Sequence, residues 1–166
     1  MPLYEFEHAI RLAASQKHTL AKAITDWHAM TFNAPRFIVG CRFIDISQGP
    51  LSETYIGGQP SKINRLFISL RSGTGRTPAQ LEDMTHKLVK IWDEIVGTSK
   101  EAQLRGVYIK GTIDSALEGG FMLPMPGKFE QWVKDNTENF KKLADAGDTD
   151  FIGLMKEIET RPEFQT

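Results

Sequence analysis

The chain has 166 residues, 40% of them hydrophobic, a formal net charge of −1 and a single cysteine, Cys41. This length and composition indicate one soluble globular domain, and the balanced charge argues against nucleic acid or an anionic membrane as a partner. One cysteine excludes an internal disulfide framework and a cysteine-rich metal site. No apolar run is long enough for a membrane span, so we expect a cytoplasmic protein.

The first third of the chain is predicted to form a strand, a helix and a second strand. Residues 3–8 read as a strand, and apolar residues recur at helical spacing over residues 15–32, with Ser15 as a candidate N-cap. The β-branched and aromatic residues of 37–46 predict the second strand. Residues 47–63 are rich in Gly, Pro and Ser and indicate a loop or a small hairpin.

The same pattern then returns. Residues 66–71 read as a strand, and Thr77 and Gln80 form a capping box that predicts the start of a helix. The apolar stripe of this helix ends at Gly97, and residues 106–111 predict the next strand. The chain therefore contains two βαβ units without letter-for-letter repetition.

Two βαβ units predict an α+β fold of two layers, in which a four-stranded sheet carries two helices on one face. The opposite face of the sheet is then bare, and association with other subunits is the simplest way to cover it. An amphipathic pattern predicts a C-terminal helix at about 128–144, followed by a polar tail from about residue 145. We expect a single domain over residues 1–166.

Pro2 is an unusual start for the first strand. Proline lacks a backbone N–H and cannot donate to a sheet ladder. If Met1 is cut off, the Pro2 nitrogen becomes a free secondary amine, which is a titratable base at the beginning of the strand.

Several stretches in the same order carry a family resemblance. They are Pro2 itself, AKAITDWH in the first helix, LRSGTGR after the third strand, and VYIKG followed by ALEGGFMLPMPG. Over about residues 2–127 the chain resembles the tautomerase superfamily and, within it, the cis-3-chloroacrylic acid dehalogenase group. The resemblance implies the tautomerase β-α-β fold, a homotrimer, a small carboxylate substrate, and no metal or organic cofactor.

The resemblance also implies removal of the initiator methionine and a set of six site residues. Carried over position by position, the catalytic residues are Pro2, Tyr108 and Glu118, and the substrate-binding residues are His28, Arg71 and Arg76. In this assignment the Pro2 amine moves the proton, His28 and the two arginines bind the substrate carboxylate, and Tyr108 and Glu118 activate water.

Each assignment has a chemical reason and a simpler structural alternative. Two arginine forks at a strand end can hold a carboxylate bidentately, but they are also typical solvated turn residues. Arg65 is an alternative to Arg71, because the RSGTGR loop is longer than is usual in the family. His28 can donate to the substrate or be an ordinary hydrogen-bonded histidine of a helix.

The two water-activating residues have similar alternatives. Tyr108 lies in an alternating strand, where half-buried tyrosines are common, and Glu118 can be a surface charge beside two glycines. The presence of Glu118 nevertheless bears on which of the possible reactions is expected. A neutral Pro2 amine is a general base for tautomerisation, whereas an amine kept cationic by Glu118 is a general acid for hydration or hydrolytic dehalogenation.

We therefore predict an N-terminal-proline tautomerase or cofactor-independent hydratase acting on small unsaturated or 2-oxo carboxylic acids, with cis-3-haloacrylate dehalogenation as a related activity. One alternative is a non-catalytic oligomeric binding protein on the same fold. Another is a decarboxylase of a small oxo acid, which would use the same arginines and proline.

Overall fold

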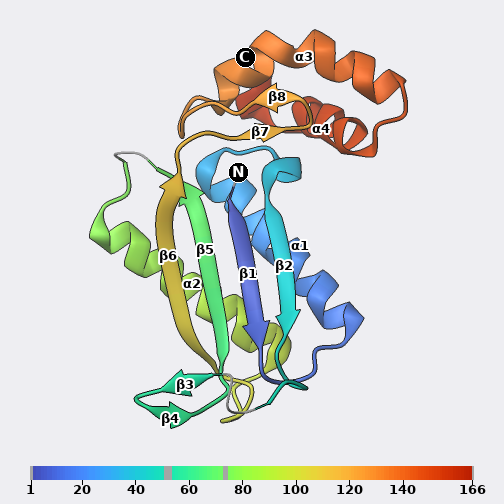
Figure 1. Cartoon of the computed structure of the whole chain (residues 1–166). Helices are drawn as coiled ribbons and strands as arrows, with labels where there is room; N and C mark the ends of the chain where they lie inside the picture. The colour runs from blue at the N-terminus through green and yellow to red at the C-terminus, as the bar shows by residue number, and fades with distance from the viewer. Residues whose placement is uncertain (1, 51–53, 73–74, 166) are drawn as a thin grey trace.

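The computed structural model, which describes residues 2–50, 54–72 and 75–165, contains a four-stranded mixed sheet in the order β2-β1-β5-β6 (Figure 1). β1 is parallel to β2, β5 is parallel to β6, and β1 is antiparallel to β5. Each parallel pair is joined by one long helix. The elements are β1 (Leu3–His8), α1 (Ala14–Phe32), β2 (Gly40–Asp45), β5 (Asn64–Arg71), α2 (Pro78–Val96) and β6 (Leu104–Ile113).

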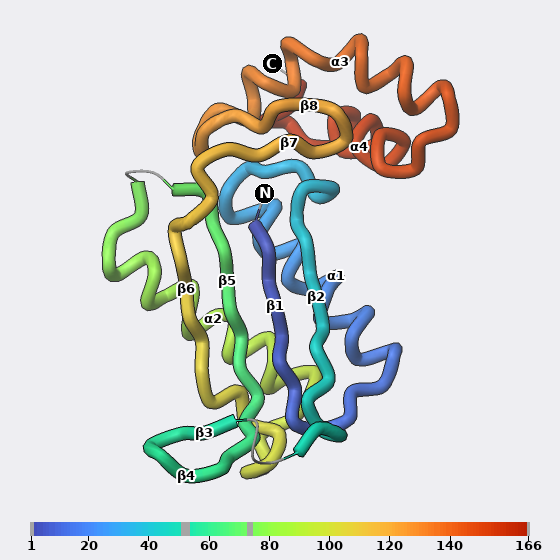
Figure 2. Tube along the Cα trace, in the orientation of Figure 1, coloured from blue at the N-terminus to red at the C-terminus, as the bar shows by residue number. Residues whose placement is uncertain are grey.

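The predicted α+β fold of two βαβ units, with two helices on one face of the sheet, is confirmed (Figure 2). Strand alternation explains the layers, because every second residue of β1 and β5 points to the helices. Tyr4, Phe6, Leu66 and Ile68 are fully buried there, and Trp92 of α2 stacks on Phe6 at 5.6 Å between ring centroids.

The two long helices begin at different kinds of cap. The capping box predicted for α2 is present, since Gln80 N–H donates to Thr77 Oγ1 and Thr77 N–H donates to Gln80 Oε1. Ser15 is not the N-cap of α1. The helix starts at Ala14, because the Gln16 side chain already accepts the N–H of Ala13 at 3.0 Å.

The second sheet face carries charged and aromatic pairs in place of helices. Glu5 pairs with Arg42 and Glu7 pairs with Arg65 across neighbouring strands. On the same face, the Phe67 and Tyr108 rings stack with their centroids 5.1 Å apart. Within the described chain, this face has no helix over it (Figure 1).

The remaining elements gather at the two ends of the sheet (Figure 1). A hairpin and four helical segments gather over the end where β1 begins, and a second small hairpin lies at the opposite end. The first group is η1 (Arg36–Ile38), β7 (Leu117–Glu118), β8 (Phe121–Met122), α3 (Phe129–Asp145), α4 (Thr149–Thr160) and η3 (Pro162–Phe164), and the second hairpin is β3 (Tyr55–Ile56) with β4 (Gln59–Pro60).

Two segments differ from the sequence-based expectation. The strand predicted for 37–46 starts only at Gly40, because the residues after Pro35 form the single turn η1. The region after about residue 145, expected as a polar tail, contains α4. Its Phe151 and Leu154 are buried against Phe140 of α3, so a short apolar stretch is enough to dock an otherwise polar segment.

A search for membrane-spanning helices among the described residues found none of sufficient length and apolar character.

Candidate active site

The main candidate site lies at the end of the sheet where β1 begins and β5 ends. The antiparallel register pairs Leu3 with Ser69, so Pro2 and Arg71 lie at the same end of the sheet. Pro2 is buried, and its carbonyl accepts the N–H of Gly40 at 3.0 Å. Both residues line a cavity of about 900 Å³, together with His28 and Arg76. Four of the six sequence-predicted site residues are therefore brought together.

Arg71 is poorly satisfied within the protein. Among the residues that the structure describes, its Nε and Nη1 atoms are buried without a hydrogen-bond partner, and its Nη2 makes only long contacts, 3.4 Å to the Leu123 carbonyl and 3.7 Å to Met125 Sδ. A bulge in the ladder places Arg71 opposite Ile113, and bulges commonly redirect side chains at functional sites. A buried guanidinium with free donors is suited to an anionic ligand.

Arg76 approaches the same cavity from the segment before α2. Its Nη1 donates to the Arg71 carbonyl at 3.2 Å, and its guanidinium lies 5.7 Å from the centre of the Phe32 ring. Among the described residues, neither Arg76 nor Arg71 forms an ion pair with a carboxylate. The two cations therefore remain available to a ligand.

His28 is held by a residue that sequence reasoning missed. The Tyr4 hydroxyl and His28 Nδ1 are 2.7 Å apart in a buried hydrogen bond. Burial, and secondarily the charge of Arg76, lower the pKa of His28 to about 3, while burial raises the pKa of Tyr4. Both side chains are therefore neutral near pH 7. When Tyr4 donates to Nδ1, the His28 Nε2 carries the proton and is a hydrogen-bond donor.

The neutral state of His28 predicts a pH-dependent stability. The pKa of His28 falls from 6.5 to about 3 on folding, so below pH 6.5 the unfolded chain binds more protons than the folded protein. The free energy of unfolding should fall by about 1 kcal/mol for each pH unit as pH drops from 6 towards 4. His28→Gln should lose this part of the slope in denaturant titrations at several pH values.

His86→Gln is the matched control, because the His86 side chain is 75% exposed. It should keep the wild-type slope, which also contains the contribution of the carboxylates. Equal slopes for the His28 variant and the wild type would contradict a buried neutral His28.

Tyr108 and Glu118 do not line the cavity of their own chain. Tyr108 is 49% exposed on the sheet face opposite α1 and α2, where it stacks on Phe67. Glu118 is half-buried in the β7–β8 hairpin, and burial, together with the charge of Asp150, raises its pKa. Within the single chain, neither predicted water-activating residue lines the cavity with the two arginines, although the positive charge of the N-terminus acts on Glu118 and opposes the rise of its pKa. The Arg65 guanidinium forms an ion pair with the Glu7 carboxylate, and Arg65 does not line the cavity.

The remaining cavity lining is largely apolar and was not predicted from the sequence. The Leu-Pro-Met-Pro-Gly motif, which served there only as part of the family resemblance, contributes Pro124, Met125 and Gly127. No pattern in the sequence identified the aromatic and aliphatic residues of the cavity wall. These residues are Trp27, Phe32, Ile38, Leu70, Met84 and Phe129. Tyr4 was recognisable as inward-facing, because it alternates with Phe6 in β1.

The described residues bring no three His, Cys, Asp or Glu side chains close enough to hold a metal ion. The ionisable groups that line the cavity are the guanidinium groups of Arg71 and Arg76, the His28 imidazole, the Asp83 and Glu130 carboxylates and the Lys87 amine, and the nitrogen of Pro2 lies beside them.

Residues 1–137 match the model of the Tautomerase_3 family, described as "Putative oxalocrotonate tautomerase enzyme". The chain belongs to this tautomerase family. A comparison with curated protein sequences found no match. The tautomerase match ends before α4, so the last helical segments lie outside the family model.

Solved structures confirm the tautomerase fold. N1, a member of the cis-3-chloroacrylic acid dehalogenase family, is 22% identical with a TM-score of 0.63, over 86% of this chain and 99% of N1. RhCC from Rhodococcus jostii RHA1 is 22% identical with a TM-score of 0.59, over 81% and 96% of the two chains. A fused 4-OT asymmetric trimer is 21% identical with a TM-score of 0.51, over 72% and 94%.

Proposed function

We propose that this tautomerase-family protein is an N-terminal-proline enzyme that acts on small unsaturated or 2-oxo carboxylic acids without a cofactor. The observation that carries the proposal is Arg71, a residue of the cavity lining whose two buried guanidinium nitrogens have no hydrogen-bond partner within the described part of the chain. Leaving such donors unsatisfied is costly, and a substrate carboxylate would remove that cost. Arg76 adds a second cation for the same anion.

The main reaction that we infer is tautomerisation of an enol acid. After removal of Met1, the Pro2 amine in its neutral form takes the proton from the enol hydroxyl and returns a proton to carbon. His28 Nε2–H donates to the carbonyl or carboxylate oxygen. Arg71 and Arg76 hold the carboxylate and draw electron density towards it. Only protons move, so no oxidant or metal is required.

Hydration is the second candidate, and Glu118 supports it. A half-buried carboxylate of raised pKa is suited to take a proton from water. Glu118 would then accept this proton, the hydroxide would add to the β-carbon, and a cationic Pro2 would protonate the α-carbon. Where the β-carbon carries a halogen, its new hydroxyl group would then lose its proton to the Pro2 amine, the C–O bond would become a carbonyl, and the halogen would leave with the C–X bonding pair as halide.

In this second reaction, the role proposed for Tyr108 requires self-association of the chain. The open sheet face carries Tyr108 away from its own cavity, and covering that face with a second copy would bring Tyr108 against another chain. A trimeric assembly, as in the fused 4-OT neighbour, is the arrangement that we propose for this chain too. Tyr108 would then assist Glu118 in a neighbouring subunit.

The two reactions are separated by replacing Glu118. We expect the wild type to ketonise a 2-hydroxydienoate and to hydrate propiolate. Glu118→Gln should lower the hydration rate by roughly 100-fold, because general-base catalysis contributes on this order, and should spare ketonisation. Both rates are read from product formation by ultraviolet absorbance and NMR.

Glu138→Gln, a change at an exposed residue of α3, should leave both rates unchanged. If Glu118→Gln hydrates propiolate as fast as the wild type, Glu118 is not the water-activating base. Release of CO₂ from a 2-oxo acid in the same assays would instead identify the decarboxylase alternative. Binding without turnover, together with a retained Met1 in the mass spectrum, would identify the binding-protein alternative.

A further inference from the structure

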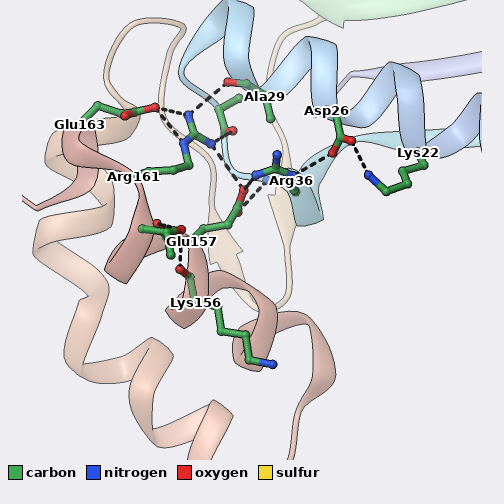
Figure 3. A network of polar contacts seen from close by, with 10 residues as sticks. Lys22, Asp26, Ala29, Arg36, Lys156, Glu157, Arg161 and Glu163 are labelled. Carbon is green, nitrogen blue, oxygen red and sulfur yellow. Dashed lines mark hydrogen bonds and ion pairs between the residues drawn. The ribbon is translucent and has the colours of Figure 1, made fainter.

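Arg161 is a buried cation far along the chain from the cavity. Its side chain is 7% exposed and makes two hydrogen bonds to the end of α1, from Nη1 to the Ala34 carbonyl at 2.9 Å and from Nη2 to the Ala29 carbonyl at 3.2 Å (Figure 3). These carbonyls lie at the C-terminal end of the helix, where the helix dipole favours a positive charge. Arg161 therefore caps α1 from outside the family-matched region.

Glu157 fixes the same junction from one turn earlier in α4. Its carboxylate accepts the Arg36 backbone N–H at 3.0 Å and Arg36 Nη1 at 2.7 Å, and it contacts Arg161 Nη1 at 3.4 Å (Figure 3). Glu163 completes the pairing of Arg161 with an Nε bond of 2.8 Å. Removing one member would leave the others buried and incompletely paired.

The segment held in this way is a wall of the cavity. The last turns of α1 and the following η1 contribute His28, Phe32 and Ile38 to it. Phe32 in turn lies under the guanidinium of Arg76, and its ring centroid is 4.6 Å from that of His28. A shift of the α1 end would therefore displace two groups that face the proposed substrate anion.

We propose that Arg161, supported by Glu157, is a positioning residue that holds the His28-bearing end of α1 in place as a wall of the active site. Of this inference, only the expected effect on substrate binding rests on the proposed function. It makes α4 and η3, which lie beyond the tautomerase match, part of the apparatus that shapes the site. Neither Arg161 nor Glu157 lines the cavity, so both act through α1 and η1.

The experiment compares Arg161→Met with Arg161→Lys in the folded full-length protein. The first removes the charge and the second keeps it, but neither can bridge two carbonyls with a planar fork. We follow the His28 imidazole by ¹⁵N NMR during a pH titration. The titratable and charged groups that act on it are Tyr4, Arg76 and the N-terminal amine, and neither variant changes them.

We expect both variants to raise the pKa of His28 by about one unit or more, because a loosened wall admits water to the ring. We also expect affinity for 2-oxobutanoate to fall roughly tenfold as the binding groups separate. A change in global stability alone would not move the titration of His28 in the folded state. Arg11→Met, at an exposed arginine, should alter neither quantity.

An unchanged His28 titration in folded Arg161→Met would overturn the proposal. If that variant does not fold, Glu157→Gln decides by the same criterion, since it keeps the side-chain volume and removes the shared charge. A wild type that fails to bind 2-oxobutanoate would refute the proposed function instead. The His28 titration would still decide the role of Arg161.

Discussion

Replacing Pro2 by alanine should lower kcat for ketonisation of a 2-hydroxydienoate by roughly 100-fold, with a much smaller change in KM. The expected loss reflects the removal of a positioned proton-transfer group, which commonly contributes 10²–10⁴-fold. Alanine replaces the secondary amine of proline by a primary α-amine and lacks the ring that fixes the nitrogen at the start of β1. Steady-state kinetics at several pH values measure both constants.

A second form of the protein separates the contribution of the Pro2 amine to activity from that of the proline ring. One extra residue before Pro2 that is not removed converts the nitrogen to an amide, which has no usable basicity, and leaves the Pro2 side chain unchanged. We expect this form to be as inactive as the alanine variant or more so, while it still binds 2-oxobutanoate. Full activity of the extended protein would refute catalysis by the Pro2 nitrogen.

Replacing Arg71 by methionine should have opposite effects on stability and on binding. Methionine removes two buried donors without partners, so the free energy of unfolding without ligand should rise by about 1 to 2 kcal/mol. Affinity for 2-oxobutanoate should fall by roughly 100-fold, because a charge-assisted hydrogen bond to the carboxylate is lost. Denaturant titration and calorimetric binding measure the two effects.

The matched control is Arg105→Met in β6, whose side chain is exposed. It should leave binding unchanged and shift stability only slightly. A destabilised Arg71→Met protein would show that the Arg71 donors are satisfied in solution, and unchanged binding would remove Arg71 from the anion site. In the wild type, saturating 2-oxobutanoate should raise the melting temperature by mass action.

Local sequence signals predicted most of the fold. Strand alternation placed Tyr4 and Phe6 on one face of β1, and the Thr77 capping box located the start of α2 within one residue. These signals depend on residues a few positions apart, so they survive in the folded chain. The 37–46 prediction lost its first residues to η1, because Pro35 favours a turn that composition alone does not reveal.

The candidate site was predicted less completely, and the reason is geometric. Pro2 and Arg71 line the same cavity because β1 and β5 are antiparallel neighbours. Two βαβ units do not dictate this strand order by themselves. Tyr108 faces away from the cavity because its register opposite Phe67 puts it on the open face. Its proposed role therefore requires a second copy of the chain.

The sequence alone determined the two βαβ units, the family resemblance and the chemical identity of the groups that gather at the cavity. Periodicity and caps are local properties, and they identify which faces must be buried. Only the tertiary structure decided that Arg71 has buried donors without partners among the described residues, that Tyr4 hydrogen-bonds to His28 Nδ1, and that Arg161 caps α1 across 127 and 132 residues of chain. Such contacts depend on how distant segments pack, and no pattern of neighbouring residues records them.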